Sequence, residues 1–239
     1  MLEKNLIKKC ICENSIGFKS LIYNYISVLE CNECGTMHQQ MTNWDDNTYY
    51  DFYKKDYHQT YQKRKGAMNY TDRYTHDRSV AVKRLDAYKD ILVPGSKGLD
   101  IGSSNSAFVH EAISRGFNCM GLDPGQDIGD DAVTIRGTLD TVNLESNSLD
   151  WITMHDSIEH MIDVNTSLEH AYNLLKTGGL LIVDLPDYFD PAGQHHWKYI
   201  EHLWFFSKDQ LGNVLEKHNF KIETVLNPIP GKLIFYVRK

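Results

Sequence analysis

The sequence predicts an α/β fold, in which a mostly parallel sheet with helices on both faces follows a small cysteine-rich segment. After Pro94-Gly95, short apolar runs alternate with stretches of helical periodicity, as strand–helix–strand crossovers do. Before that point, four of the five cysteines fall within the first 34 residues. We therefore expect three parts in the 239-residue chain: a cysteine-rich segment over 1–45, a tyrosine-rich helical connector over 46–93, and the α/β domain over 94–239.

The cysteines of the first segment form two close pairs, Cys10-x-Cys12 and Cys31-x-x-Cys34, with a β-prone stretch between them. Two turns joined by a hairpin can direct four sulfurs at one ion, which is how a tetrahedral zinc site is built. A segment of this size has little core of its own, and a metal would supply folding free energy. We therefore predict a zinc-ribbon-like segment with a structural Zn²⁺. Free thiols that happen to cluster are the alternative.

Tyrosines are concentrated in the connector. Four of them are spaced to share one face of a helix, namely Tyr50, Tyr53, Tyr57 and Tyr61. This pattern predicts a helix that packs its rings on the main domain, or one whose phenols line the opening of a substrate site. A second helix is expected over 75–92, ending before Pro94-Gly95.

Seven strands are expected in the α/β domain, which makes the predicted sheet Rossmann-like. They are 98–101, 119–122, 133–135, 150–154, 180–185, 221–226 and 233–237. The expected helices are 107–115, 164–175 and, for the most part, 203–218. The last two strands are separated by the turn 227–231 and should form a closing hairpin.

Composition narrows the classes of partner. The formal net charge is −7, which argues against a nucleic-acid partner, because gripping the phosphate backbone needs a basic surface. No apolar run has the length of a membrane span, and the charged N-terminus does not resemble a secretory signal. We therefore expect a cytoplasmic protein with mostly reduced or metal-bound cysteines.

Polar and small residues follow the first two strands of the predicted sheet. The first strand runs through Asp100 to Gly102 and Ser103, and the second ends at Asp123. Ligands of open α/β sheets bind beyond the carboxyl ends of the strands where the strand order reverses. Gly102 lets the backbone approach a nucleoside closely, and a carboxylate such as Asp123 can accept from both ribose hydroxyls. A nucleoside-containing cofactor is therefore predicted.

This ordered series resembles the class I S-adenosylmethionine (SAM)-dependent methyltransferases. Their first motif, Asp/Glu-x-Gly-x-Gly-x-Gly, is matched at Asp100 and Gly102, with Ser104 and Ser106 in place of the later glycines. The serines disfavour a dinucleotide, whose pyrophosphate needs a glycine-lined cradle. The resemblance covers about residues 91–239 and implies SAM as methyl donor. The residues that it implies for donor binding are Asp100, Gly102, Ser103, Asp123, Thr138, Leu139 and His155.

A further resemblance concerns the segment after the fifth strand. Tyr199, Glu201 and His202 are similar to a Tyr-x-Glu-His segment of the zinc-containing sugar C-methyltransferases (methyltransferase-23-like), which also carry a four-cysteine N-terminal region. The resemblance implies that these residues lie at the acceptor site, with Glu or His as proton acceptor. A His beside a carboxylate suits proton removal at neutral pH. Alternatively, Glu201-His202 forms the first turn of the following helix, and His202 is structural.

Together these features predict methyl transfer from SAM to a small-molecule acceptor, a sugar or nucleotide-linked sugar in surface polysaccharide biosynthesis. His202, aided by Glu201, takes the acceptor's proton, and Tyr199 orients the acceptor. We expect O-methylation, because the 239 residues do not include the further C-terminal domain of the C-methylating group. The alternatives are sugar C-methylation, methylation of a protein or RNA docked by the zinc segment, and a non-catalytic cofactor-binding partner subunit.

Overall fold

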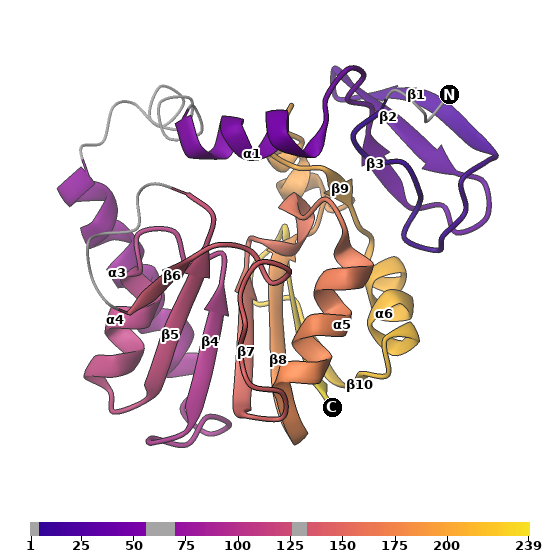
Figure 1. Cartoon of the computed structure of the whole chain (residues 1–239). Coiled ribbons are helices and arrows are strands. Elements are labelled where there is room, and N and C mark those ends of the chain that lie inside the picture. Colours follow the sequence, from indigo (N-terminus) through magenta and orange to yellow (C-terminus); the bar gives the residue numbers. More distant parts are fainter. Residues whose placement is uncertain (1–4, 56–69, 126–132) are drawn as a thin grey trace.

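The computed structural model describes residues 5–55, 70–125 and 133–239, which form two sheets and the helices around them (Figure 1). The strands of the larger sheet are β4 (Lys97–Ile101), β5 (Asn118–Asp123), β6 (Thr134–Arg136), β7 (Leu149–His155), β8 (Leu175–Pro186), β10 (Lys221–Leu226) and β11 (Lys232–Arg238). Their order is β10-β11-β8-β7-β4-β5-β6. This confirms the mostly parallel, seven-stranded, Rossmann-like sheet that the sequence predicts.

The strand order reverses at the centre of this sheet. β4 pairs in parallel with β5 on one side and with β7 on the other, and β8 continues in parallel beyond β7. Only β11 runs the other way, since it is antiparallel to both of its neighbours, β8 and β10. The crevice beyond the carboxyl ends of β4, β5 and β7 is therefore the switch point at which such sheets bind ligands.

Helices cover both faces of the larger sheet. They are α3 (Tyr70–Ala87), α4 (Ala107–Ser114), α5 (Val164–Leu174) and α6 (Lys208–Lys217). Neighbouring strand residues point to opposite faces. Trp151 of β7 and Ile182 of β8 are buried in a cluster with side chains of α3 and α4, whereas Ile152 and Leu181 are buried with side chains of α5 and α6. Both faces are apolar, as a parallel sheet between two helical layers requires.

The smaller sheet combines the N-terminal segment with a strand from far along the chain. Its strands are β1 (Phe18–Tyr23), β2 (Ile26–Cys31), β3 (Met37–Gln39) and β9 (Trp204–Phe205), in that order. β9 is antiparallel to β3, with Trp204 opposite His38. The four-stranded sheet thus joins residues of the predicted 1–45 segment to residues of the α/β domain.

The helix expected over 203–218 is wrong in its first part. Trp204 and Phe205 are almost fully buried in β9, because large aromatic side chains suit a sheet packed on both sides. The helix α6 begins only after Ser207, whose hydroxyl accepts from the backbone N–H of Gln210 while the Gln210 side chain accepts from the Ser207 N–H. This capping box is a helix start that the sequence itself contains.

β8 is longer than the strand expected over 180–185. The helix α5 ends at Leu174 and the strand starts at once, with Leu175 opposite Leu149 of β7. Between Leu175 and Leu180 the register of β8 against β7 shifts, and Gly178 within this stretch adopts a positive φ of 77°. Glycine tolerates that conformation, so the strand can resume beyond it.

The first helix of the connector lies at one edge of the larger sheet (Figure 1). The helix α1 (Asp46–Lys55) passes over the carboxyl ends of the central strands (Figure 1) and carries Tyr50 and Tyr53. Tyr57 and Tyr61 of the predicted helical face lie outside the described residues. Within the ranges that the structure describes, no helix combines the length and the apolar character needed to cross a membrane.

Candidate functional site

A cavity of about 640 Å³ lies beyond the carboxyl ends of the central strands and beneath α1. Its volume is within the range of sites that bind small molecules. All the residues implied for donor binding line it, namely Asp100, Gly102, Ser103, Asp123, Thr138, Leu139 and His155. The fold therefore brings together, from β4, β5, β7 and the loop after β6, residues that are widely separated in the sequence.

Asp100 and His155 are held in fixed orientations at the floor of this cavity. The Asp100 carboxylate is buried and accepts from the hydroxyl of Thr153 at 2.7 Å. Its same oxygen lies 3.2 Å from His155 Nδ1, and His155 Nε2 lies 3.0 Å from the Tyr88 hydroxyl. Burial, aided by the positive charge of Arg84, lowers the pKa of His155. The ring is thus neutral at pH 7 with both nitrogens engaged, which suits positioning better than proton transfer.

The loop after β4 approaches its surroundings closely. Gly102 has a φ of 81°, and a Cβ added there would lie 2.5 Å from the Cβ of Ser157. The next side chain, Ser103, has a buried hydroxyl for which the described residues offer no hydrogen-bond partner. The backbone N–H groups of Ser104 and Gly125 donate to the two carboxylate oxygens of Asp123 at 2.9 and 2.7 Å. These bonds orient the Asp123 carboxylate at the end of β5.

The residues expected at the acceptor side are only partly brought together. His202 lines the cavity, and its Nδ1 lies 2.8 Å from the Tyr188 hydroxyl. Glu201 is buried beside it but does not line the cavity, and its carboxylate lies 3.4 Å from Lys198 Nζ. Tyr199 is 53% exposed and does not line the cavity either. Burial lowers the pKa of His202 well below its usual value, so this ring is neutral at pH 7.

A second Glu-His pair, which the sequence analysis did not assign to the acceptor side, meets the first. Glu159 and His160 follow β7, and the rings of His160 and His202 meet edge to face with centroids 4.7 Å apart. Burial, reinforced by the charge of Asp156, raises the pKa of Glu159 to about 8, whereas burial lowers the pKa of His160 to about 4. The Glu-His dipeptide occurs three times in the sequence, at 159–160, 169–170 and 201–202, and nothing in the sequence shows that the first and the last of these meet.

An ion-pair network forms one wall of the cavity. Arg84 of α3 lies 2.7 Å from Asp184 and 3.1 Å from Asp156, and Lys232 of β11 contacts both carboxylates. Burial alone would raise the pKa of Asp156, but Lys232 and Arg84 hold it well below its usual range. The network fixes α3 against the ends of β7, β8 and β11.

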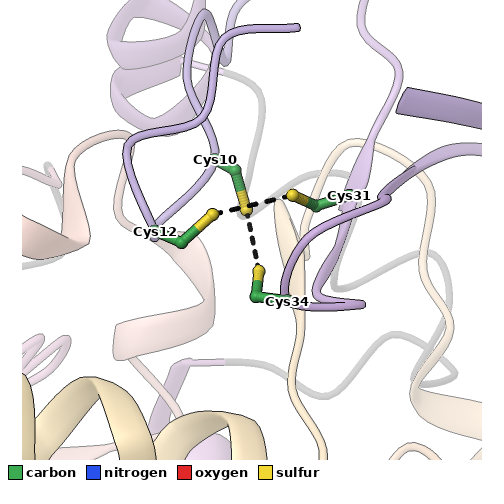
Figure 2. A group of neighbouring side chains, drawn as sticks. All are labelled: Cys10, Cys12, Cys31 and Cys34. Carbon is green, nitrogen blue, oxygen red and sulfur yellow. Dashed lines mark hydrogen bonds between the residues drawn. The ribbon is translucent and has the colours of Figure 1, made fainter. Parts of the chain in front are cut away.

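The four N-terminal cysteines converge outside this cavity. Figure 2 shows their sulfurs pointing toward one another from two turns. Cys10 Sγ lies 3.4 Å from Cys34 Sγ, and Cys12 Sγ lies 3.6 Å from Cys31 Sγ. All four sulfurs are within 4.8 Å of one another. Zinc–sulfur bonds of 2.3 Å in a tetrahedron would place sulfurs about 3.8 Å apart, so this donor set fits such a site.

A family comparison decides the class of the protein. The model of a family described as a methyltransferase domain matches residues 74–225, which is more than half of the chain. The chain belongs to this methyltransferase family. The match spans α3, the central strands and the Glu-His pairs, and therefore includes most of the cavity lining. No curated protein sequence matches the chain.

Solved structures of SAM-dependent methyltransferases are similar to the chain. One from Archaeoglobus fulgidus has a TM-score of 0.60 at 15% identity, covering 77% of this chain and 100% of its own. A possible histamine N-methyltransferase from Thermotoga maritima has a TM-score of 0.53 at 23% identity, covering 66% and 89%. Phosphoethanolamine N-methyltransferase 2 of Haemonchus contortus, in complex with SAM, has a TM-score of 0.55 at 16% identity, covering 69% and 52%. At such identities the likeness shows the fold, and family and fold together support a SAM-dependent methyltransferase.

Proposed function

We propose that this methyltransferase transfers the methyl group of SAM to a hydroxyl of a small-molecule acceptor, a sugar or nucleotide-linked sugar used in surface polysaccharide biosynthesis. One observation carries the proposal: a single cavity is lined both by the expected donor-binding residues and by His202. Donor and acceptor can therefore meet inside it, in the arrangement that methyl transfer requires.

The donor side can hold a nucleoside without a phosphate. Asp123 is positioned to accept from ribose hydroxyls, and Gly102 leaves room for close approach of the ligand to the backbone. Leu139 offers an apolar surface for the adenine, and Asp100 with His155 forms the polar floor. Bound SAM supplies an activated methyl group on a sulfonium. The residues of the chain then have to orient the two reactants and exclude water.

The acceptor side is polar enough for a hydroxylated ligand. Tyr49 and Tyr53 of α1 line it together with His196 and Lys198, so phenol, imidazole and ammonium groups face the same space. This supports the interpretation of the connector tyrosines as part of a substrate opening. We assign removal of the acceptor's proton to this side and to His202 in particular. The group that orients the His202 ring is the Tyr188 hydroxyl. Glu201 does not take this role, because its carboxylate lies beside Lys198.

We also propose that Cys10, Cys12, Cys31 and Cys34 hold a structural Zn²⁺. The support is the convergence of the four sulfurs at nearly tetrahedral spacings. Four thiolates fill the coordination shell of the ion, which leaves no open position for a reactant. The ion's contribution would be to the stability of the turns that carry β1, β2 and β3.

The function is tested by incubating the protein with labelled SAM and a panel of nucleotide sugars, followed by mass analysis of the products. We expect a gain of one methyl group on a sugar hydroxyl. Label found only in protein or RNA would contradict a small-molecule acceptor. Donor binding without any turnover, restored by a second chain, would instead indicate a non-catalytic partner subunit.

A further inference from the structure

The carboxylate of Glu159 is fully buried next to His160, and the described residues offer it no hydrogen-bond partner. Its residue is 0% exposed, and neither carboxylate oxygen is hydrogen-bonded within the described part of the chain. A buried carboxylate in this condition carries a large desolvation cost unless a cation or a proton compensates it. The imidazole of His160 lies beside it, with Nε2 4.0 Å from Oε1 and thus beyond hydrogen-bond distance.

The tautomer of His160 can be derived from its contacts. His160 Nδ1 contacts the backbone oxygen of Glu201 and the hydroxyl of Tyr53. The carbonyl oxygen can only accept, whereas the hydroxyl can accept as well as donate. Nδ1 therefore carries the proton, and Nε2 presents a lone pair toward Glu159 Oε1. Two electron-pair donors thus face each other in a buried space. A positive ion between them would satisfy both at once.

His202 supplies a third donor to the same point. Its Nδ1 lies 2.8 Å from the Tyr188 hydroxyl, which leaves Nε2 free to point elsewhere. One ligand atom each from Glu159, His160 and His202 can be chosen so that all three lie within 4.8 Å of one another. Ligands of one divalent transition-metal ion, at about 2.0–2.2 Å from it, lie about 3–4 Å apart. Small side-chain shifts would therefore complete the coordination.

We propose that Glu159, His160 and His202 form a second metal site, which binds a divalent first-row transition-metal ion such as Zn²⁺ or Fe²⁺. Two imidazoles and one carboxylate are a ligand set that such ions favour and that leaves coordination positions open. The second contacts also fit, because a metal-bound His usually donates its other N–H to a carbonyl or another oxygen. Here the oxygens belong to Glu201 for His160 and to Tyr188 for His202.

The open positions of this ion would face the acceptor side of the cavity, because His160 and His202 line it while Glu159 lies behind them. This use of the ion rests on the proposed function. An acceptor hydroxyl bound to the ion would have a lowered pKa and would release its proton to water. With Nε2 on the ion and Nδ1 beside the Tyr188 hydroxyl, His202 would then be a ligand that helps lower the pKa of the acceptor hydroxyl, and water would take the proton in its place.

Metal stoichiometry tests the site independently of methyl transfer. The full-length protein, stripped with a chelator, is titrated with Zn²⁺ and its bound metal is counted, with Co²⁺ as a spectroscopic probe. We expect two equivalents in the wild type, one on thiolates and one on nitrogen and oxygen ligands. Glu159→Gln and His160→Gln should each lose the second equivalent and keep the first. His196 lines the same cavity without belonging to the cluster, so His196→Gln should keep both equivalents of metal.

A wild type that binds only the thiolate-held equivalent would overturn the second site, as would a Glu159→Gln variant that still binds two. Glu159→Gln removes a buried charge and keeps the side-chain volume, so folding of the variant can be checked by its thermal transition. If the variant fails to fold, the number of metal ions bound by the wild type and its Co²⁺ spectrum still decide whether the second site exists. Two bound equivalents of metal without methylation of any acceptor would support the second metal site and contradict the proposed function.

Discussion

At the scale of single residues, Gly102 combines two constraints that can be separated. Its φ of 81° disfavours any side chain, and a Cβ would also overlap Ser157. Gly116 has a similar φ of 87° with open space around it, so it carries the first constraint alone. Gly102 also lies in the lining of the donor side, whereas Gly116 closes α4 at the opposite end of the sheet.

We predict that Gly102→Ala weakens SAM binding about tenfold or more and destabilises the fold by more than the roughly 1 kcal/mol expected from backbone strain alone. Gly116→Ala should show the strain alone and bind SAM normally. Calorimetric titration with SAM and thermal denaturation of both variants measure the difference. Equal donor affinities in the two variants would argue against close approach of the donor at Gly102.

His202 is the residue on which the acceptor chemistry depends. We predict that His202→Ala lowers turnover by about two orders of magnitude or more while SAM affinity stays nearly unchanged. His195→Ala is the matched control, because His195 is exposed and lies outside the cavity lining. Steady-state kinetics with an accepted sugar, together with donor titration, gives both numbers. Unimpaired turnover in His202→Ala would remove the assignment.

At the scale of elements, Cys31 ends β2 and Cys34 lies in the turn before β3, so a metal held by the four cysteines would fix these strands. We predict that Cys12→Ser lowers the bound zinc by one equivalent and lowers the thermal transition temperature, because a structural zinc site contributes folding free energy. Cys119→Ser should leave the zinc content unchanged, since Cys119 lies in β5, away from the cluster. Atomic absorption and calorimetry measure the two effects. Four thiols that react freely in the native, metal-free protein would contradict the zinc site.

The pairing of β3 with β9 contains a buried imidazole that makes stability depend on pH. His38 packs between the rings of Phe18 and Trp204, and burial lowers its pKa to about 4. Between about pH 6.5 and 4 the unfolded chain therefore binds this proton more readily than the folded one, so stability falls as pH falls through that window. We predict that His38→Phe removes about 2 kcal/mol of the fall in unfolding free energy between pH 7 and pH 5. Urea unfolding at pH 7 and pH 5 checks it, with His195→Phe as the exposed control.

At the scale of the whole molecule, the smaller sheet holds the segment that carries His202. The side chain of Gln39, at the end of β3, donates to the backbone oxygens of His202 at 2.8 Å and Lys198 at 3.1 Å, and accepts from the N–H of Ile200 at 2.8 Å. The N-terminal sheet is thus coupled to the acceptor side of the cavity by direct hydrogen bonds. The smaller sheet therefore contacts the segment that carries His202 through the Gln39 side chain.

We predict that Gln39→Ala lowers kcat about tenfold or more and leaves SAM affinity nearly unchanged, because the segment 198–202 loses its fixed position. Gln40→Ala is the control, since the Gln40 side chain accepts from Ser20 on the same sheet and does not reach this segment. Kinetics and donor titration of the two variants make the comparison. Equal kcat values would show that the sheet does not position His202.

The strands and the residues that follow them could be predicted from local sequence patterns. Alternating apolar runs and helical stretches located every strand of the larger sheet, since each pattern reports burial on a nearby surface. Asp100, Gly102 and Asp123 could be expected in one site because they follow strands that end at the same edge. The helix boundary at Ser207 was missed although the capping box is local, because the aromatic run before it suits a helix or a strand.

By itself, the sequence determined the class of the sheet, the polar residues at the carboxyl ends of β4 and β5 and the two pairs of cysteines, since all of these follow from the order and spacing of residues along the chain. Only the tertiary structure decided the surroundings of His202. It paired β9 with β3, turned Glu201 toward Lys198, left Tyr199 exposed and brought Glu159 and His160 to His202. These contacts join segments that are far apart in sequence. No local pattern specifies such contacts, because they are selected by how the side chains pack in the complete core.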